Sequence, residues 1–535
     1  MFSMVAMEQS KLFEELKNPS TYGSNIKSVD VLQTHISFVA LTGKYAYKVK
    51  KPVNFGFLDF SILDKRKHYC EEELRLNKRL CPDLYLDVVP FTTKNNHLEI
   101  NGDGESVEYA VKMKEFPQQN IMTKLLEKDE INEENIEIIC DILVDFYKKD
   151  KHTSEIDQYG MIEYIKKNTD ENFEQTLSCI GSTISKDVYN FIKDTTNKFL
   201  QNKKETFQNR IQDGYIHDCH GDLHSGNIVI TGKDVCIFDC IEFNKRFRYS
   251  DAASDIGFLA MDLDYQGQPY LASYLIDKYM EKSKDQDILK VLNFYKCYRA
   301  YVRGKVTGFK LDDPNIDKKD RQDIIDSAKR YFDLAQYYAK LFSRDIKKTR
   351  PFLFITSGIT GTGKTTAARK IMVDYNAHMI STDMVRKELE GMDKYERHHD
   401  EYNTGLYSPE KMMQTYKKII EKAEKTLKKN KNVVLDATFK NSELRDMAKN
   451  ISQKTNSGFL ILNCSCPENI VKKYLEERVK KKSISDGRWE IYLKQKDSFE
   501  PLTNNDNFVE IDISNKSYNY QINKFRQTLE KTDEV

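Results

Sequence analysis

Residues 217–230 read HDCHGDLHSGNIVI and place a carboxylate, Asp222, five positions before an amide, Asn227. Another carboxylate, Asp239, directly follows the apolar run VCIF. Carboxylate and amide oxygens are the ligands that Mg²⁺ prefers, and a carboxylate can also orient an attacking hydroxyl group. The three residues therefore predict one site at which magnesium is held against phosphates.

The same stretch is rich in transition-metal ligands, which leaves a second interpretation open. Histidine and cysteine bind zinc, commonly from paired spacings such as C-x-x-C, and the chain has no such pair. Each histidine also has a simpler structural role, so we favour magnesium over zinc. The residues that a zinc site could use are His217, Cys219, His220, His224, Cys236 and Cys240.

A second stretch, GITGTGKTT at residues 358–366, fits the pattern G-x-x-x-x-G-K-[ST]. It follows the apolar run FLFITS and opens an expected helix, which is the context that this loop needs. Backbone N–H groups and the helix N-terminus can neutralise phosphate charge, Lys364 can reach the β and γ oxygens, and Thr365 can bind Mg²⁺. The pattern predicts a nucleotide site made by Gly358, Gly361, Gly363, Lys364, Thr365 and Thr366.

Two carboxylates downstream of this loop follow expected strands. Asp436 ends VVLD, and Asp383 lies in ISTDMVRKEL with Arg386 three residues later. A spacing of three places Asp383 and Arg386 on one side of a helix start. Asp383 has a rival role as the N-cap of that helix.

The elements that position these residues form two series. The first predicts a small antiparallel sheet with one helix: a hairpin turning at Gly43, a helix over 65–80, strands over 84–92 and 107–113, and a hairpin turn at 101–104. Helices continue to about residue 210 and from about 255 to 342, and 343–351 reads as a linker. Strands then alternate with helices, which predicts an open parallel α/β sheet.

HGDLHSGN closely matches the motif H-G-D-x-H-x-x-N of the aminoglycoside phosphotransferase family, and the resemblance covers about residues 30–340. It implies an α+β, two-lobed, protein-kinase-like domain. By this resemblance Asp222 is the catalytic aspartate, and Asn227 and Asp239 are the Mg²⁺ ligands. Asp251 and Asp255 fix either the catalytic loop or the start of a helix.

The same resemblance assigns the nucleotide contacts of the N-terminal lobe. In YAYKVKKPV, Lys48 best matches the strand lysine that grips the α and β phosphates, with Lys50 as a rival. Glu73 in CEEELRLN is similar to its helix partner, with Glu72 also possible. Residues 113–116, from Met113, resemble the hinge that receives adenine. Gly43 is the only glycine left to cover the phosphates, which departs from the usual glycine-rich loop.

Residues 350–530 resemble the P-loop kinases of the polynucleotide-kinase and zeta-toxin type, through the glycine loop, the D-x-x-R pattern and VVLD. The resemblance implies that Asp383 is the general base, that Arg386 contacts the acceptor and that Asp436 supports Mg²⁺. The stretch YLEERVKKKSISDGRW would be a lid, in which Arg478 touches the transferring phosphate and Arg488 is a weaker candidate.

Bulk composition excludes several classes of protein. The chain has 535 residues, with 84 Lys and Arg against 83 Asp and Glu, and its formal charge is +1. Its net charge therefore gives no overall attraction to nucleic acid or to an anionic membrane. No apolar run approaches the roughly 18 residues that span a bilayer. The N-terminus lacks the features of a secretory signal, and ten cysteines without a framework spacing indicate reduced thiols. We therefore expect a cytoplasmic protein.

We predict two domains: residues 1–345, with an N-lobe at about 1–115 and a C-lobe at about 118–342, and residues 346–535, an α/β P-loop NTPase domain. The combination resembles bifunctional proteins that join an aminoglycoside phosphotransferase-like domain to an ATP-binding domain. It implies two ATP- and Mg²⁺-dependent sites, each phosphorylating a hydroxyl of a small molecule, a nucleotide or an RNA end. The alternative is one small-molecule kinase that a C-terminal ATP-binding switch regulates.

Overall fold

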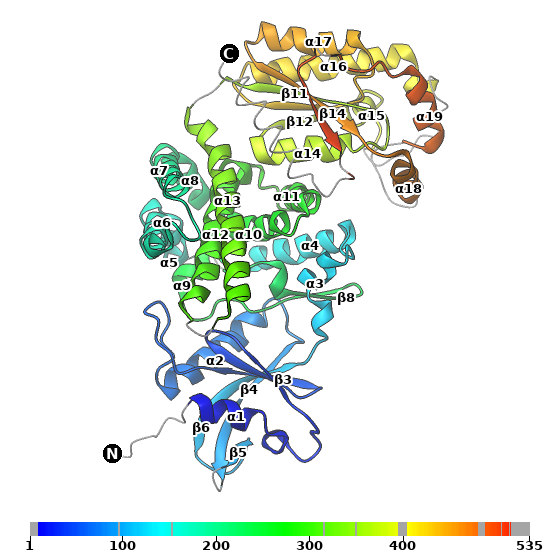
Figure 1. The fold of residues 1–535 in the computed structure, drawn as a ribbon. Coiled ribbons are helices and arrows are strands. Elements are labelled where there is room, and N and C mark those ends of the chain that lie inside the picture. Colours follow the sequence, from blue (N-terminus) through cyan, green and yellow to red (C-terminus); the bar gives the residue numbers. More distant parts are fainter. Residues whose placement is uncertain are drawn as a thin grey trace. The chain divides into compact units, whose positions relative to one another are not determined.

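The computed structural model of the protein describes residues 9–94, 97–150, 153–313, 316–347, 350–393, 404–479, 487–503, 506–512 and 514. The chain packs as two compact units, residues 1–336 and 337–535 (Figure 1). The division lies inside helix α13 (Lys318–Lys347), before the expected boundary at residue 345. The expected linker at 343–351 was thus partly wrong, because α13 continues to Lys347.

The N-lobe of the first unit is a six-stranded antiparallel sheet in the order β1-β2-β3-β6-β4-β5. Its hairpin turn at 101–104 was wrongly predicted to pair the flanking strands, because β6 lies between β3 and β4 while β5 pairs with the other edge of β4. The elements are α1 (Gln9–Leu16), β1 (Asp30–Gln33), β2 (Ser37–Leu41), β3 (Tyr45–Lys50), α2 (Leu63–Asn77), β4 (Tyr85–Lys94), β5 (His97–Ile100) and β6 (Ser106–Lys114).

Strand β3 separates two hydrophobic clusters. Successive side chains of a strand point to opposite faces of its sheet. Tyr47 and Val49 pack in the cluster that contains Leu12 of α1, whereas Ala46 packs in the cluster that contains Cys70 of α2. Because Lys48 and Lys50 share the face of Ala46, both lysines are directed toward α2.

The C-lobe is mostly helical, and two short antiparallel pairs, β7 with β10 and β8 with β9, flank the HGDLHSGN loop. Helix α10 is buried almost throughout, packs on α11 and α12, and contacts residues 225–227 of this loop. The helices are α3 (Met122–Glu127), α4 (Glu133–Lys149), α5 (Ser154–Asp157), α6 (Ile162–Gln175), α7 (Lys186–Asn202), α8 (Lys204–Gln212), α9 (Lys245–Arg248), α10 (Ala252–Tyr265), α11 (Pro269–Ser283) and α12 (Leu289–Phe309), and the strands are β7 (Ile216–Asp218), β8 (Ile228–Thr231), β9 (Asp234–Ile237) and β10 (Tyr249–Asp251).

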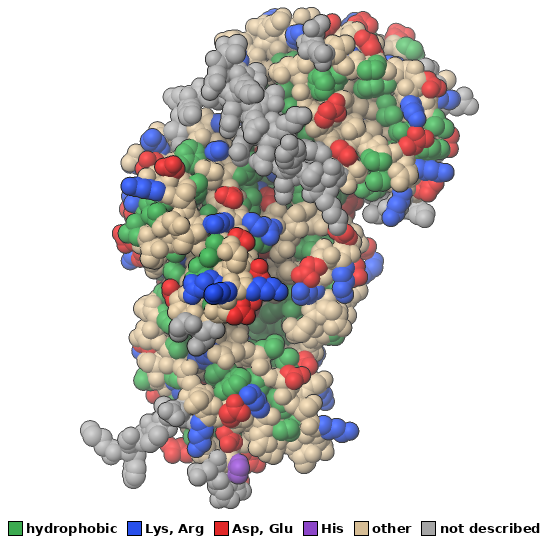
Figure 2. All heavy atoms as spheres, in the orientation of Figure 1, with side chains coloured by type: hydrophobic (Ala, Val, Ile, Leu, Met, Phe, Trp, Pro, Cys, Tyr) green, Lys and Arg blue, Asp and Glu red, His purple; other side chains and the backbone are tan. Residues whose placement is uncertain are grey.

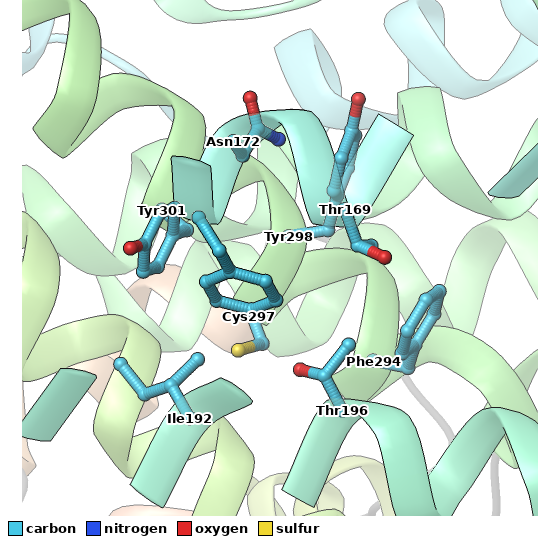
Figure 3. Close-up of a pocket in the computed structure, with 9 residues that line it drawn as sticks. Thr169, Asn172, Ile192, Thr196, Phe294, Cys297, Tyr298 and Tyr301 are labelled. Carbon is cyan, nitrogen blue, oxygen red and sulfur yellow. The ribbon is translucent and has the colours of Figure 1, made fainter. Parts of the chain in front are cut away.

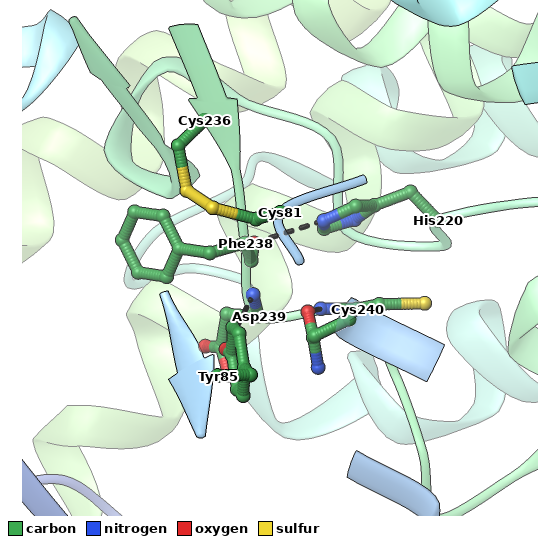
Figure 4. Close-up of a disulfide and its surroundings, with 8 residues drawn as sticks. Cys81, Tyr85, His220, Cys236, Phe238, Asp239 and Cys240 are labelled. Carbon is green, nitrogen blue, oxygen red and sulfur yellow. Dashed lines mark hydrogen bonds between the residues drawn. A yellow bond between two sulfur atoms is a disulfide. The ribbon is translucent and has the colours of Figure 1, made fainter. Parts of the chain in front are cut away.

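Cys81 and Cys236 form a disulfide that joins the segment after α2 to strand β9 (Figure 4). The expectation of reduced thiols is therefore wrong for these two cysteines. They lie 155 residues apart, so their spacing along the chain gives no sign of the contact that the fold creates. The other eight cysteines are free.

The second unit has a five-stranded parallel sheet in the order β12-β13-β11-β14-β15. Every residue of the central strand β11 is buried, as expected for a parallel strand covered on both faces. Helices α16 and α17 cover one face of the sheet and α14 the other (Figure 1). The elements are β11 (Phe352–Ser357), α14 (Lys364–Tyr375), β12 (His378–Ser381), α15 (Thr382–Leu389), α16 (Pro409–Leu427), β13 (Val433–Asp436), α17 (Ser442–Lys454), β14 (Gly458–Ser465), α18 (Glu468–Val479), α19 (Trp489–Ser498) and β15 (Phe508–Asp512).

Figure 2 shows basic and acidic side chains interspersed over the visible face of the molecule, as the near-equal numbers of the two kinds lead one to expect. Among the described residues, none of the helices combines the length and the apolar composition that a bilayer crossing requires.

Candidate active sites

In the first unit, Lys48 and Lys50 share one carboxylate. The Lys48 Nζ atom lies 2.8 Å from Glu73 Oε1, and Lys50 Nζ lies 2.6 Å from Glu73 Oε2. Glu73 is fully buried on the inner face of α2, whereas Glu72 pairs with Arg75 on the outer face at 2.7 Å. Burial opposes ionisation of Glu73, but the two lysines outweigh it and lower its pKa to about 2.

The two lysines differ in their second partner. Lys48 also forms an ion pair with Asp239, and Lys50 forms one with Glu242. The Asp239 side chain is 41% exposed, so a solute can reach the Lys48 pair, whereas Lys50 is only 1% exposed. This difference favours Lys48 over Lys50 as the lysine that meets a ligand.

The loop from His220 to Asn227 brings Asp222 and Asn227, two of the predicted site residues, into contact. The Asn227 side-chain amide donates to the backbone oxygen of Asp222 at 3.0 Å and to its Oδ2 at 3.2 Å. His224 Nε2 lies 3.4 Å from the same Oδ2 atom. Burial opposes ionisation of Asp222, but His224 and then Arg303 favour it, and the pKa falls well below its usual value. The Asp222 side chain is still 36% exposed, so an incoming molecule can reach an ionised carboxylate.

Residues of α10 and α12 hold this loop by its backbone. Asp255 accepts from the N–H groups of His220 and Gly221 at 2.6 and 3.0 Å, and Asp262 accepts from that of Ser225 at 2.9 Å. Arg299 donates to the Gly221 carbonyl at 2.8 Å. Sequence reasoning missed Asp262 and Arg299 in this role, although buried charges on otherwise apolar helices are a usable signal.

Asp251 and Asp255, near the start of α10, were expected to fix either the loop or the start of a helix, and each does one of the two. Asp255 fixes the loop at 220–227 through the two N–H groups described above. Asp251 is the N-cap of α10, where it accepts from the Ala253 N–H at 2.8 Å, and it also receives a bidentate ion pair from Arg210. Asp251 thus fixes the helix start rather than the loop.

Asp239 adopts an unusual backbone conformation, with φ at 64°. Aspartate tolerates this left-handed region better than most residues do. The Asp239 N–H donates to the Tyr85 hydroxyl at 3.2 Å, and the next N–H, of Cys240, donates to Asn77 at the end of α2 at 2.8 Å. Figure 4 shows Asp239 between Tyr85 and the Phe238–His220 contact. The turn therefore aims the Asp239 carboxylate back toward Lys48.

The alternative zinc site is not formed. His220 Nε2 contacts the Phe238 carbonyl at 2.9 Å, His217 lies beside Asp150 at 3.4 Å, and Cys236 is in the disulfide. Among the residues that the structure describes, no group of three or more His, Cys, Asp or Glu side chains is arranged to hold a metal ion.

The predicted hinge at 113–116 spans the end of β6 and the start of the connection between the lobes, whereas the predicted phosphate cover, Gly43, lies away from the lysines. Met113 is inside β6, where its side chain is buried in a hydrophobic cluster, and the connection between the lobes follows at 115–117. Gly43 is at the β2–β3 turn, and its N–H donates to the Glu115 side chain of that connection at 2.7 Å. Gly43 therefore does not lie over Lys48 and Lys50. These lysines are at the end of β3 that lies beside the turn at 34–36, before β2, whereas Gly43 is in the turn after β2.

A cavity in the C-lobe lies among α6, α7 and α12 and is lined mainly by apolar side chains (Figure 3). Tyr298 and Tyr301 of α12 line this cavity, and Tyr295 of the same helix is buried. Arg299 of this helix donates to the Gly221 carbonyl of the loop at 220–227. Tyr295 and Tyr301 therefore belong to the core of the C-lobe.

In the second unit, the glycine loop has the conformations that its glycines allow. Gly358, Gly361 and Gly363 have φ values of 144°, 81° and 87°. A Cβ atom on Gly358 would lie 2.5 Å from the Cys464 backbone oxygen, so a side chain has no room there. Lys364 Nζ donates to the Ile359 carbonyl at 2.8 Å, which holds the lysine across the loop.

The two oxygen-bearing residues expected beside Mg²⁺ are in contact. Thr365 Oγ1 donates to Asp436 Oδ2 at 2.8 Å, and Thr366 follows it in the first turn of α14. Asp436 ends β13, next to β11 in the sheet, so the loop and the carboxylate meet at the carboxyl edge. Burial raises the pKa of Asp436, against the opposing influence of Lys364 and the Thr365 hydrogen bond.

Asp383 and Arg386 form an ion pair at 3.0 Å. The N-cap of α15 is Ser381, so Asp383 lies in the first turn rather than at the cap. Arg386 is buried, with its guanidinium 4.5 Å from the centre of the Tyr407 ring. Arg478 lies on α18, but its side chain is outside the described residues, and Arg488 is the N-cap residue of α19.

One contact of the glycine loop was not predicted. The Gln495 side-chain oxygen, on α19, accepts from the Thr360 backbone N–H at 2.7 Å. Helices α18 and α19 also pack on the loop, since Val471, Leu475 and Tyr492 form a cluster with Ile359. A glutamine in a charged helix carries no sequence signal for such a contact.

Comparison with known proteins gives one family match and one set of relatives. Residues 353–502 match the family model described as an AAA domain. Uncharacterized proteins of Mycobacterium tuberculosis and Mycobacterium bovis are 28% identical over 443 residues, which cover 83% of this chain and 85% of each relative. Because 443 residues exceed the 336 of the first unit, this similarity extends into both units.

Two solved structures are similar to one unit each. The GDP complex of wild-type aminoglycoside 2′-phosphotransferase-IIIa is 12% identical, covers 61% of this chain and 99% of its own, and has a TM-score of 0.36. A gluconokinase from Sinorhizobium meliloti 1021 is 15% identical, covers 34% of this chain and 98% of its own, and has a TM-score of 0.23.

The predicted fold classes are confirmed. The first unit is a two-lobed α+β domain with an antiparallel sheet. The second is a P-loop domain with a five-stranded parallel sheet, a glycine loop after its central strand and an AAA family match over most of its length.

Proposed function

We propose that this protein is an ATP- and Mg²⁺-dependent kinase with two nucleotide sites, each of which transfers a γ-phosphoryl group to an acceptor hydroxyl. The observation that carries the proposal is the convergence of Lys48, Glu73, Asp222, Asn227 and Asp239. Lys48 contacts both Glu73 and Asp239, and Asn227 contacts Asp222. The Phe238 N–H donates to the Asn227 carbonyl at 2.9 Å, which links the two groups.

In the first unit, the ionised and partly exposed Asp222 would accept the proton of the acceptor hydroxyl as it attacks. Asn227 directs its amide nitrogen at Asp222, so its amide oxygen faces away from that carboxylate. This oxygen and the Asp239 carboxylate are a hard donor set that suits Mg²⁺, which would neutralise phosphate charge when bound. Lys48 would exchange its contact with Asp239 for the nucleotide phosphates.

In the second unit, the backbone N–H groups from Gly361 to Thr365 and the start of α14 would hold the phosphates. Thr365 and Asp436 offer hydroxyl and carboxylate oxygens to Mg²⁺ from positions already in contact. Asp383 would orient the acceptor hydroxyl, and its ion pair with Arg386 holds its carboxylate in place. We assign Arg478 to the transferring phosphate, by analogy with lid arginines of similar kinases.

The test incubates γ-labelled ATP and Mg²⁺ with a metabolite and RNA extract. It compares the intact protein with Asp222→Ala, Asp383→Ala and Lys364→Ala, and it uses Glu72→Gln as a surface control. Two labelled products, one lost with Asp222→Ala and the other with Asp383→Ala, are expected. Nuclease treatment then separates an RNA acceptor from a small molecule or nucleotide. A protein that yields neither product from any fraction contradicts the proposal.

A second candidate function makes the C-terminal unit a nucleotide-driven switch that controls the first unit. The contact of Gln495 with the Thr360 N–H favours it, because a side chain of the protein lies on the glycine loop where a ligand would bind. In that case Asp383→Ala changes no product, whereas Lys364→Ala removes ATP hydrolysis or alters the Asp222-dependent product. Gln495→Ala would then raise the nucleotide affinity of the second unit.

A further inference from the structure

We propose that Lys50 and Glu242 are positioning residues of the first nucleotide site. They anchor Glu73 and the turn at Asp239, so that Lys48 can leave Asp239 for a phosphate without releasing helix α2. The inference rests on the proposed function of the first unit, and it assigns a role to a second lysine and a second carboxylate that the phosphoryl transfer itself does not use.

The geometry is a chain of four buried or partly buried ion pairs. Glu73 gives one oxygen to Lys48 at 2.8 Å and the other to Lys50 at 2.6 Å. Beyond the lysines, Lys48 pairs with Asp239, and Lys50 pairs with Glu242. The two ends of the chain differ in access: Lys50, Glu73 and Glu242 have side chains 1%, 0% and 5% exposed, whereas Asp239 is 41% exposed.

The Lys50–Glu242 end of this series of ion pairs avoids a cost that a single lysine–glutamate pair would carry. A buried carboxylate that loses its only cation is strongly destabilised. If Lys48 turned toward a phosphate, its contact with Glu73 would weaken. The other carboxylate oxygen of Glu73 would remain in contact with Lys50. Glu242 keeps Lys50 in place, and the Phe60 ring, 5.0 Å from Lys50 Nζ, closes the remaining side.

The same pair fixes the turn that carries Asp239. Asp239 and Glu242 belong to one short segment, and Lys48 and Lys50 lie on one face of β3. The Lys50–Glu242 pair therefore holds this segment against the strand independently of Lys48. Backbone contacts support it, since the Cys240 N–H donates to Asn77, whose own amide donates to the Glu73 carbonyl, each at 2.8 Å.

The experiment uses the full chain carrying Lys364→Ala, so that nucleotide binding reports the first site alone. Glu242→Gln and Lys50→Met are compared with the conservative variant Lys50→Arg and with the surface control Glu72→Gln. Calorimetry gives the affinity for Mg²⁺ with a non-hydrolysable ATP analogue, and hydrogen exchange gives the protection of α2 with and without that ligand. Loss of such supporting partners typically weakens binding by about 10-fold to 100-fold.

We expect Glu242→Gln and Lys50→Met to bind at least about tenfold more weakly, and Lys50→Arg and Glu72→Gln to bind like the parent. In the two weakened variants, the ligand should increase exchange in α2, whereas in the parent it should decrease it. Equal loss of protection with and without ligand would show a purely structural role and overturn the inference, as would unchanged affinity. A parent that does not bind the nucleotide contradicts the proposed function itself, and the inference with it.

Discussion

The two units neutralise charge at their candidate sites in opposite ways. The first uses side chains from distant positions, and its central carboxylate, Glu73, is held ionised by two lysines that lower its pKa to about 2. The second uses one contiguous glycine loop, and its carboxylate, Asp436, is buried with a raised pKa. The first site is thus charge-paired before any ligand arrives, whereas the second keeps a carboxylate that a cation would stabilise.

The largest effect that this comparison predicts is on the stability of the first unit. Glu73→Gln leaves Lys48 and Lys50 buried beside a neutral side chain. Breaking a buried ion pair by removing one partner costs about 3–5 kcal/mol, and we expect a loss of this size in the free energy of unfolding. Hydrogen exchange of β3 in the full chain measures it locally.

The matched control is Glu72→Gln, one position earlier on the same helix. Its carboxylate pairs with Arg75 at the surface, so its loss should cost no more than about 1 kcal/mol. Equal effects of the two substitutions would mean that the buried pairs do not stabilise the first unit, and that the contrast between the sites is wrong.

The disulfide gives the next largest effect, also confined to the first unit. Cys81→Ser combined with Cys236→Ser removes a cross-link between residues 155 apart, for which a loss of about 2–4 kcal/mol is typical. Denaturant unfolding with and without reductant measures it. Reductant should destabilise the parent and leave the double variant unchanged. Cys466→Ser, at a partly exposed free cysteine of the second unit, is the control.

Sequence patterns reached the second site more directly than the first. The glycine loop, Thr365 and Asp436 follow from a short motif and from the rule that parallel strands end at one edge. In the first unit the motif around Asp222 gave the residues of one loop. The shared contact of Lys48 and Lys50 with Glu73 required the strand and helix to be placed side by side, so the sequence left both lysines and both glutamates open.

Errors in the fold had the same origin. The turn at 101–104 has the composition of a hairpin, yet β6 pairs with β3 and β4 because strand order depends on contacts between distant residues. The pairing of Cys81 with Cys236 and the contact of Gln495 with the glycine loop also depend on tertiary packing alone. Local composition predicted the elements well and their partners poorly.

A smaller effect concerns the glycine loop. Gly358→Ala combines a φ of 144° with a Cβ atom 2.5 Å from the Cys464 backbone oxygen. Overpacking and strain of this kind lower the free energy of unfolding by about 1–3 kcal/mol. We expect the second unit to lose nucleotide binding and the first unit to keep it. Gly391→Ala is the control, because Gly391 also has a positive φ, of 70°, but has open space around its Cβ position. If both variants bind nucleotide equally, the close approach to β14 does not shape the loop.

The smallest predicted effect is on the stability of the second unit, where the contrast between the two sites requires that Asp436→Asn stabilise rather than destabilise. Burial raises the pKa of Asp436, so its ionised form costs stability at neutral pH in the absence of ligand. Asp436→Asn should therefore stabilise the nucleotide-free second unit by about 1 kcal/mol at pH 7 while weakening Mg²⁺-dependent nucleotide binding. Hydrogen exchange of β11 with and without ligand separates these two changes.

The effects of the two substitutions have opposite signs at pH 7, and both should shrink in acid. The lowered pKa of Glu73 contributes stability that is present above about pH 4.5 and is lost as the pH falls toward about 2, so the penalty of Glu73→Gln shrinks in acid. The gain from Asp436→Asn also shrinks in acid, because the parent carboxyl becomes protonated as the pH falls through its raised pKa. A destabilising Asp436→Asn at pH 7 would mean that the Thr365 hydrogen bond outweighs burial, and that both units keep their carboxylates ionised by pairing.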